Sequence, residues 1–435
     1  MSLRAHLVRG IFGSLGLTIT SAGLAFVNGV LLARLLGASG YGVYAAAIAV
    51  VLLMAVPLTL GFDRLLVRDV AASGTTSSWE PAQGLARRAV QIVFPVSLLA
   101  IMVVGSAALL LGSFPADTLP VLWLALLMVP LLVLITLRRA ITQGLRYIVS
   151  SQLPDALIRP GLFTLLLLLA VASGIALTAL GAMALNLASV AVALVVGVIL
   201  LRRQMPVAMR QARPTYETRH WLSQALPFAL STAATTLMNQ IDVVLVGGIA
   251  GAAPAGLYAV ATRGAGLAAF GAMAVSTTLA PTAAQLWKQH EPARLQVVVT
   301  RAARGAFAFA LAVAIVLWIF GPQFLLLFGQ EFSAANQTMA LLALAQVIDC
   351  GFGIGGLLLS MTGYQGLNFA AIGTAVVVRI SLDIALIPML GAAGAGVAAV
   401  VSITILNVIA TYFAARRLRL DATPLGVTRD RGAGD

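Results

Sequence analysis

The 435-residue chain has little of what soluble enzymes and disulfide-bonded proteins depend on. It has one cysteine, Cys350, so no disulfide framework can form, and its three histidines have no cysteine or carboxylate at ligand spacing. We therefore expect no metal site and no cofactor. Charged residues make up 9% of the chain and hydrophobic residues 60%, which is far from the balance of a soluble domain. The composition predicts an integral membrane protein.

Acidic residues are especially scarce, with 14 Asp and Glu against 27 Lys and Arg, for a net charge of +13. In a soluble protein this excess would suggest nucleic acid as a partner. Here the basic residues lie in short gaps beside apolar segments, where they meet anionic lipid headgroups. We expect membrane lipids as partners and no nucleic acid.

Long apolar segments recur along the whole chain. A helix needs about 20 residues to cross roughly 30 Å of hydrocarbon. A window of that length predicts an all-α membrane protein with about twelve transmembrane helices, at residues 11–32, 41–62, 89–111, 119–137, 157–173, 179–201, 226–249, 256–279, 306–327, 338–360, 369–390 and 393–415.

The basic residues alternate with these spans. Of the 27, 24 lie before span one or in the gaps after even-numbered spans, and only Arg34 lies in the opposite gaps. Because cytoplasmic loops carry the excess of Lys and Arg, we predict a multi-pass protein of the bacterial inner membrane with both termini in the cytoplasm. The last two, Arg263 and Arg379, fall inside spans, where a charge costs roughly 2.5–3.5 kcal/mol and needs a reason.

The two halves of the sequence resemble each other at an offset of 214 residues. Six spans in each half predict parallel repeats, since both halves then enter the membrane in the same orientation. We expect two six-helix lobes around a central cavity: 1–203 as the N-terminal lobe, 204–221 as a cytoplasmic linker, 222–420 as the C-terminal lobe and 421–435 as a disordered cytoplasmic tail. The repeated positions include Gly37, Gly42 and Tyr44 with Gly251, Gly256 and Tyr258.

Polar residues at helical spacing on spans one and seven indicate where a cavity would lie. Asn28 and Asp242 are equivalent at the 214-residue offset. Such a stripe forms either hydrogen bonds between packed helices or the wall of a water-lined cavity, and both interpretations remain open. The stripes are Ser14, Thr18, Ser21 and Asn28 on span one, and Ser231, Thr235, Asn239 and Asp242 on span seven.

Four segments carry a resemblance to a known family. They are ARLLGASGYGVY at 33–44, LGFDRLLVR at 60–68, NQIDVVLVG at 239–247 and GLY at 256–258. They resemble the Wzx-type polysaccharide flippases, whose superfamily also holds multidrug and toxic-compound extruders and lipid II flippases. The resemblance extends from about residue 7 to residue 419, and its motifs are structural.

The resemblance implies a transporter and not an enzyme. By that resemblance the protein moves an undecaprenyl-pyrophosphate-linked oligosaccharide from the inner to the outer leaflet by alternating access. The oligosaccharide would serve O-antigen (lipopolysaccharide), capsule or exopolysaccharide synthesis, with polysaccharide assembly proteins as candidate partners.

Two other functions remain as alternatives. A cation-coupled multidrug extruder on the same fold would be expected to have a buried carboxylate in the N-terminal lobe, and the six predicted spans there contain none. A membrane-embedded polysaccharide polymerase or ligase needs acid, base or nucleophile groups near the outer face. The short outer gaps offer few such residues.

Arg263 is the first candidate for contact with the pyrophosphate, because a guanidinium binds phosphate oxygens in a bidentate manner. Its alternative role is an ion pair with Asp242. Arg379 has Asp383 four residues later, which predicts an internal ion pair.

Four further residues complete the candidate set. Asn28 and Asn239 would line the cavity with Asp242. Arg64 flanks the cytoplasmic mouth and could attract an anionic headgroup, although topology alone also explains a basic residue there. Asp349 is the lone acid of span ten, where it would bind a coupling proton or cation, or a hydrogen-bond donor of a neighbouring helix.

Overall fold

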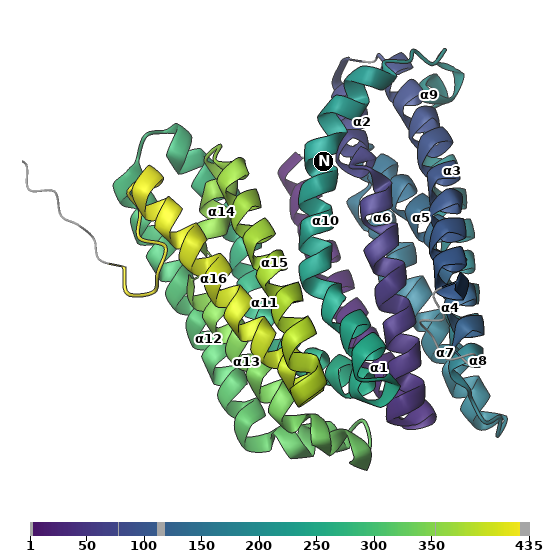
Figure 1. Ribbon diagram of the computed structural model, residues 1–435. Helices are drawn as coiled ribbons and strands as arrows, with labels where there is room; N and C mark the ends of the chain where they lie inside the picture. The colour runs from purple at the N-terminus through teal and green to yellow at the C-terminus, as the bar shows by residue number, and fades with distance from the viewer. Residues whose placement is uncertain (1–2, 77, 111–117, 353, 427–435) are drawn as a thin grey trace, which may run out of the picture. The chain divides into compact units, whose positions relative to one another are not determined.

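The computed structural model describes residues 3–76, 78–110, 118–352 and 354–426. Within these ranges the chain is built of helices and contains no β-strand (Figure 1). It divides into two compact units, Met1–Gln240 and Ile241–Asp435, whose boundary falls inside α10. The predicted lobe and linker boundaries stay predictions, as does the central cavity between lobes.

The helices of the first unit are α1 (Leu3–Ala55), η1 (Pro57–Thr59), α2 (Phe62–Thr76), α3 (Glu80–Leu110), α4 (Leu119–Leu126), α5 (Met128–Gly144), α6 (Ile148–Leu153), the π-helix η2 (Pro154–Ile158), α7 (Arg159–Ala172), α8 (Ala179–Gln204), α9 (Val207–Gln211) and α10 (Thr218–Ile249), which continues into the second unit. The remaining helices are α11 (Ala252–Lys288), α12 (Pro292–Leu326), η3 (Gln330–Ala335), α13 (Asn336–Phe352), α14 (Ile354–Met361), α15 (Gln365–Leu390) and α16 (Ala392–Leu418).

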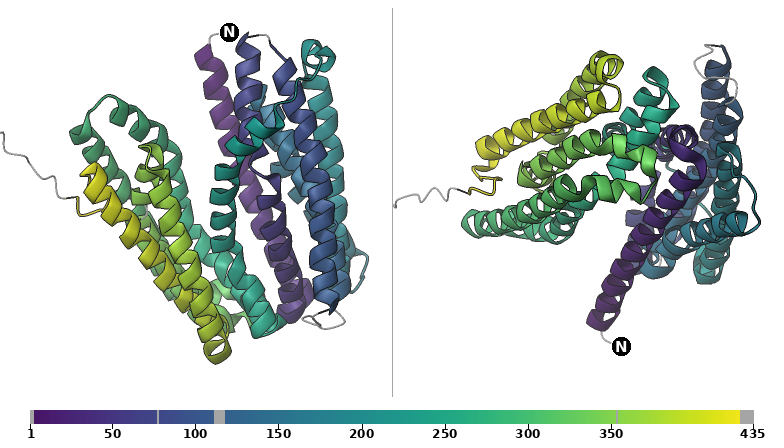
Figure 2. Two further views of the ribbon diagram at one scale, coloured as in Figure 1. Left: turned by 45° about the horizontal axis from the view of Figure 1, so that its top comes forward. Right: turned by 90° about the horizontal axis from the view of Figure 1, so that it is seen from below.

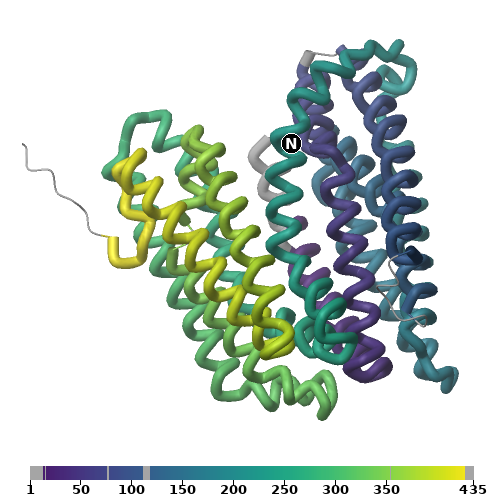
Figure 3. Tube along the Cα trace, in the orientation of Figure 1, coloured from purple at the N-terminus to yellow at the C-terminus, as the bar shows by residue number. Residues whose placement is uncertain are grey.

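Ten helices of the described ranges are long and apolar enough to cross a membrane, and the bent pair 330–352 and 354–361 makes an eleventh. The 53-residue α1 is one of the ten, although it is not straight. Gly37 interrupts it with φ 66° and ψ 177°, a conformation that only glycine adopts without strain. The purple tube of Figure 3 accordingly turns within α1. Counting α1 as two spans gives the twelve that the sequence predicts.

The second half repeats this break at the equivalent position. Gly251, which lies 214 residues after Gly37, has φ 97° and ψ 179° and separates α10 from α11. A helix, an extended glycine and a second helix therefore begin each half. This agreement in backbone conformation supports the repeat inferred from the sequence.

Each unit is a bundle of closely packed helices. In the first, α5 packs against α2, α3 and α8, while α1 packs against α7 and α8. In the second, α16 packs against α13, α14 and α15, as the green-to-yellow helices of Figure 2 show. A Cβ at Gly355 would lie 3.0 Å from the backbone nitrogen of Thr411. Small residues therefore allow close approach of helices, which packing in membranes requires.

The fifth span starts nine residues earlier than the sequence analysis predicts. It covers Ile148–Ala172, combining α6, η2 and α7. Arg159, which we assigned to a cytoplasmic gap, is the twelfth residue of this 25-residue span. Two prolines and the charges of Asp155 and Arg159 lower the local hydropathy, so a window analysis begins the span too late. The correction adds a third arginine to the interior of the spans.

The C-terminal segment also differs from its predicted disorder. Asp421 forms two backbone hydrogen bonds with the Gln296 side chain on α12, both 2.7 Å long. Leu420 and Ala422 are buried in a cluster with residues of α11, α12, α14 and α16. Residues 421–426 are thus ordered because their apolar side chains and backbone groups find partners on α12. The rest of the predicted tail, 427–435, lies outside the described residues.

Candidate functional site

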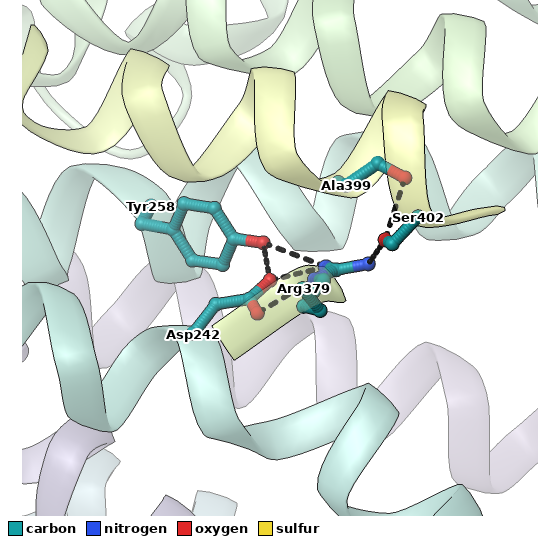
Figure 4. A network of polar contacts seen from close by, with 5 residues as sticks. All are labelled: Asp242, Tyr258, Arg379, Ala399 and Ser402. Atoms are coloured by element: carbon teal, nitrogen blue, oxygen red, sulfur yellow. Dashed lines mark hydrogen bonds and ion pairs between the residues drawn. The ribbon is translucent and has the colours of Figure 1, made fainter. Parts of the chain in front are cut away.

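A buried charged network lies in the second unit (Figure 4). The Arg379 guanidinium on α15 donates from Nε to Asp242 Oδ1 at 2.8 Å, and its Nη2 bonds Asp242 Oδ2. The hydroxyl of Tyr258 on α11 donates to the same carboxylate. Side chains of three helices are therefore held together by one carboxylate.

This network also includes α16. Arg379 Nη1 donates to Ser402 Oγ at 3.2 Å, and Ser402 in turn donates to the carbonyl of Ala399 at 3.1 Å. Asp242 is 4% exposed and Arg379 is 5% exposed. Breaking such a pair by removing one partner is strongly destabilising, since it leaves an uncompensated buried charge.

The partner of Arg379 is not the one that sequence spacing predicts. We expected an ion pair with Asp383, one turn later on α15, and the structure places Arg379 on Asp242 instead. Asp383 is fully buried, and neither of its carboxyl oxygens has a hydrogen-bond partner among the described residues. Asp242 is the partner because its carboxylate meets two parallel N–H groups of the guanidinium at once, and such a bidentate ion pair is stronger than a single hydrogen bond. Contact of these three residues with substrate stays a prediction.

A neutral network occupies the equivalent place in the first unit. Asn28, 6% exposed, donates from Nδ2 to the carbonyl of Pro160 at 3.1 Å and accepts from Thr164 Oγ1 at 2.7 Å. Tyr44 accepts a 2.6 Å hydrogen bond from Asn186 Nδ2 on α8. Asn28 therefore joins α1 to α7, which favours the helix-packing interpretation of its stripe.

The span-seven stripe divides into an exposed part and a buried end. Ser231, Thr235 and Asn239 are exposed, and the two hydroxyls donate to carbonyls of their own helix. Asn239 has no hydrogen bond within the described part of the chain. Exposed polar side chains inside a span are costly against lipid, so this stretch keeps its interpretation as a cavity wall, whereas Asp242 belongs to the buried network.

Arg263 is the twelfth residue of the 37-residue α11 and is partly buried. Its alternative partner, Asp242, is bound instead by Arg379 and Tyr258. Arg64 lies in the first turn of α2 with 69% of its side chain exposed, at 3.8 Å from Asp63. The two arginines are therefore in different environments, one within a span and the other at a solvated helix end.

Asp349 lines a cavity of about 310 Å³ in the second unit. Its Oδ1 accepts a hydrogen bond from Asn407 Nδ2 on α16 at 3.0 Å. Ser360 and Asn368 also line the cavity and bond each other, with Asn368 Nδ2 donating to Ser360 Oγ at 3.0 Å. Four helices thus bring one carboxylate, two amides and a hydroxyl to one place. Asp349 thus bonds a neighbouring helix, which is one of the two roles that the sequence left open, and binding of a coupling proton or cation stays a prediction.

The sequence analysis missed a basic cluster in the first unit. Arg138 on α5 is 3% exposed and donates from Nη2 to Asp155 at 3.2 Å and to the carbonyl of Ser151 at 3.3 Å. Gly197 of α8 makes room for this guanidinium, because a Cβ there would lie 2.6 Å from Arg138 Nε. Arg159 lies one turn beyond Asp155. The fifth span of each half contains an arginine, although Arg159 and Arg379 are 220 residues apart and so are not equivalent at the 214-residue offset.

The sequence matches the family model described as polysaccharide biosynthesis protein over residues 7–287 and the MatE model over residues 227–385. No curated protein matches the chain.

Solved structures match over nearly the whole chain. An inward-facing multidrug resistance MATE family transporter of the MOP superfamily aligns with a TM-score of 0.76 and 15% identity, covering 94% of this chain and 98% of that one. The lipid II flippase MurJ, in an inward closed conformation, aligns with a TM-score of 0.71 and 14% identity, covering 92% and 87%. A MOP superfamily transporter from Pyrococcus furiosus gives 0.64 and 14%, covering 95% of each chain. These likenesses confirm the predicted fold class.

Proposed function

The chain belongs to the polysaccharide biosynthesis protein family, and from this premise we propose that it is a flippase for a polyprenyl-pyrophosphate-linked oligosaccharide. The substrate would be of the undecaprenyl type and would move from the cytoplasmic to the outer leaflet of a bacterial inner membrane. Both termini would lie in the cytoplasm, and polysaccharide assembly proteins would supply and receive the substrate. The product would serve O-antigen, capsule or exopolysaccharide synthesis.

The position of Arg263 carries this proposal. A pyrophosphate that leaves the headgroup region needs positive partners, and an arginine inside a span is costly unless it has a function or a counter-ion. Asp242, the counter-ion suggested by the sequence, is already bound by Arg379 and Tyr258. The place of Arg263 within a span, twelve residues into α11, is therefore suited to contact with a pyrophosphate.

The mechanism that follows is alternating access. The sugar and pyrophosphate would enter a cavity open to the cytoplasm, with Arg263 binding the phosphate oxygens and Asn239 contacting the sugar. The polyprenyl chain would stay in the lipid, since transfer of each CH₂ to water costs about 0.8 kcal/mol. Rocking of the two halves would then expose the headgroup to the outer side.

Reconstitution into vesicles tests the proposal. Vesicles containing an undecaprenyl-pyrophosphate-linked oligosaccharide would be assayed for transfer between leaflets, with Arg263→Ala compared with the wild type. We expect a loss of about tenfold or more in the transfer rate, because hydrogen bonds to a charged group contribute about 1.5–3 kcal/mol. Arg294→Ala is the matched control, since Arg294 is 77% exposed and pairs with Glu291 three residues earlier. Full transfer by folded Arg263→Ala would remove this role.

A multidrug extruder is the second candidate, favoured by the MatE match over residues 227–385. The same vesicles, loaded with a cationic dye, separate the two functions. Dye efflux without lipid transfer would replace the flippase proposal. A polymerase or ligase would instead lengthen or transfer the oligosaccharide, which chromatography of the recovered lipid detects.

We also propose that the Asp349 cavity takes the coupling proton or a small cation. Carboxylate, amide and hydroxyl oxygens are the donors that hard cations prefer, and the cavity brings these groups together from α13, α14, α15 and α16. Lipid transfer measured under imposed proton and sodium gradients shows which ion, if either, drives transport. A transfer rate that responds to neither gradient would contradict a coupling role for this cavity.

A further inference from the structure

Arg159 lies deep in the fifth span, on a helix face that points into the first unit. Eleven residues separate it from Ile148, the start of the span, which is about 16 Å along a helix at 1.5 Å per residue. Arg159, Phe163 and Leu167 are spaced by four and share one face. Phe163 is 4% exposed and stacks on Tyr44 with ring centroids 6.5 Å apart, and Leu167 is fully buried. The arginine is therefore on the interior side of α7.

The charge of Arg159 is not balanced by its surroundings. Within the described ranges no hydrogen bond or ion pair joins its guanidinium to another side chain. Tyr44 and Asp155 are the titratable side chains that act electrostatically on it. Asp155 is in turn shared with Arg138 and Arg139 and forms its ion pair with Arg138. One carboxylate thus faces three guanidinium groups, and the excess positive charge attracts an anion.

The repeat shows what kind of group is absent. Arg379 lies on the fifth span of its half, as Arg159 does, and contacts Tyr258, the equivalent of Tyr44. In the second half the Asp242 carboxylate accepts hydrogen bonds from both this arginine and this tyrosine. In the first half the equivalent residue is Asn28, which is neutral and bonded to Pro160 and Thr164. The two arginines are not equivalent at the 214-residue offset, which pairs Arg379 with Leu165, but the first half likewise has an arginine on its fifth span and no carboxylate at the position of Asp242.

We propose that Arg159 binds a phosphate group of the transported lipid as its counter-ion. The ligand class is a polyprenyl phosphate or pyrophosphate, and the inference rests on the proposed flippase function. Arg159 is partly exposed, whereas Arg379 is 5% exposed, so a ligand can reach it. A guanidinium supplies paired N–H donors that match two phosphate oxygens.

Binding of lipid probes to the purified full-length protein tests this assignment. Native mass spectrometry would compare undecaprenyl pyrophosphate with undecaprenol, which has the same chain and no phosphate. The wild type is expected to prefer the pyrophosphate, and Arg159→Gln to lose about tenfold or more of that preference. Arg139→Gln is the control, because Arg139 is an exposed neighbour of the same Asp155. It should keep the wild-type preference.

The outcomes separate this inference from the proposed function. If folded Arg159→Gln keeps the preference while the wild type moves lipid in vesicles, the assignment is wrong and the flippase proposal stands. If the wild type itself does not distinguish the two lipids, both the assignment and the proposed substrate are wrong. Should Arg159→Gln fail to fold, Arg159→Lys retains the charge without the paired donors. It should show an intermediate preference, and a wild-type preference in that variant would also overturn the assignment.

Discussion

The two halves of the chain place the same tyrosine and a similarly located arginine in networks of opposite character. In the second half, Arg379 is bound by the Asp242 carboxylate and contacts Tyr258, and all three side chains are buried. In the first half, Asn28 stands at the position of Asp242 and Arg159 has no carboxylate of its own. The two halves therefore keep the tyrosine at an equivalent position, while the arginine lies elsewhere on the fifth span and the carboxylate of Asp242 is replaced by the amide of Asn28.

This difference separates a structural role from a binding role for buried arginines. A guanidinium with a bidentate carboxylate inside its own bundle fixes α10, α11 and α15 to one another, and an added anion would compete with an existing ion pair. A guanidinium without such a partner bears the cost of burial until an anion arrives. Of the two, only the arginine of the first half is suited to an anion that comes and goes during transport.

Removing the two arginines in turn should give the largest contrast. Arg379→Met leaves Asp242 buried without its partner, and we expect it to lower the free energy of unfolding by about 3–5 kcal/mol. Arg159→Met breaks no ion pair, so its effect should be below about 1 kcal/mol. Unfolding in mixed micelles, followed by circular dichroism, measures both. Equal losses in the two variants would contradict the assignment of different roles.

A second test gives the first half the missing carboxylate. Asn28→Asp loses the hydrogen bond to the Pro160 carbonyl, with an expected cost of about 1–3 kcal/mol. Its new charge should pair with Arg159 and weaken undecaprenyl pyrophosphate binding severalfold. The matched control is Asn28→Ala, which loses the same hydrogen bond without adding a carboxylate and should bind the lipid as the wild type does. If the two variants bind undecaprenyl pyrophosphate equally well, a carboxylate at position 28 does not compete with the phosphate for Arg159, and the assignment is wrong.

The parts of the fold that depend on local sequence could be predicted. The length of the apolar segments predicted the spans, and the shared spacing of glycine and tyrosine predicted the repeat. The structure agrees with the repeat, because the helix break at Gly37 recurs at Gly251. Both properties are set by residues near one another in the chain. The place of Asp242 and Arg379 within spans also followed from the sequence, whereas the burial of Asp242 did not.

The pairing of charges could not be predicted, because it depends on packing between distant segments. Asp242 and Arg379 are 137 residues apart, whereas Asp383 is one turn from Arg379 and looked like the natural partner. Arg159 was missed for a related reason. The predicted span began at residue 157, which left Asp155 outside it and Arg159 at its edge among the cytoplasmic residues, and only the helices from Ile148 to Ala172 show that both charges lie within the span.

The smallest expected effect concerns the exposed polar stripe of span seven, where the amide of Asn239 has no counterpart in the first half. Asn239 is exposed without a hydrogen bond among the described residues, and its equivalent in the first half is Ala25, also exposed. Asn239→Ala should change the free energy of unfolding by less than about 0.5 kcal/mol. If the amide contacts the sugar, the variant should slow lipid transfer about two- to tenfold, the value of one neutral hydrogen bond. Transfer at the wild-type rate would show that Asn239 lies outside the substrate path, whereas a loss of stability would show that it joins helices.

The reverse change, Ala25→Asn, adds an amide to the first half and should leave stability equally unchanged. Any effect of either variant on transport then reports contact with the substrate and not a change in packing.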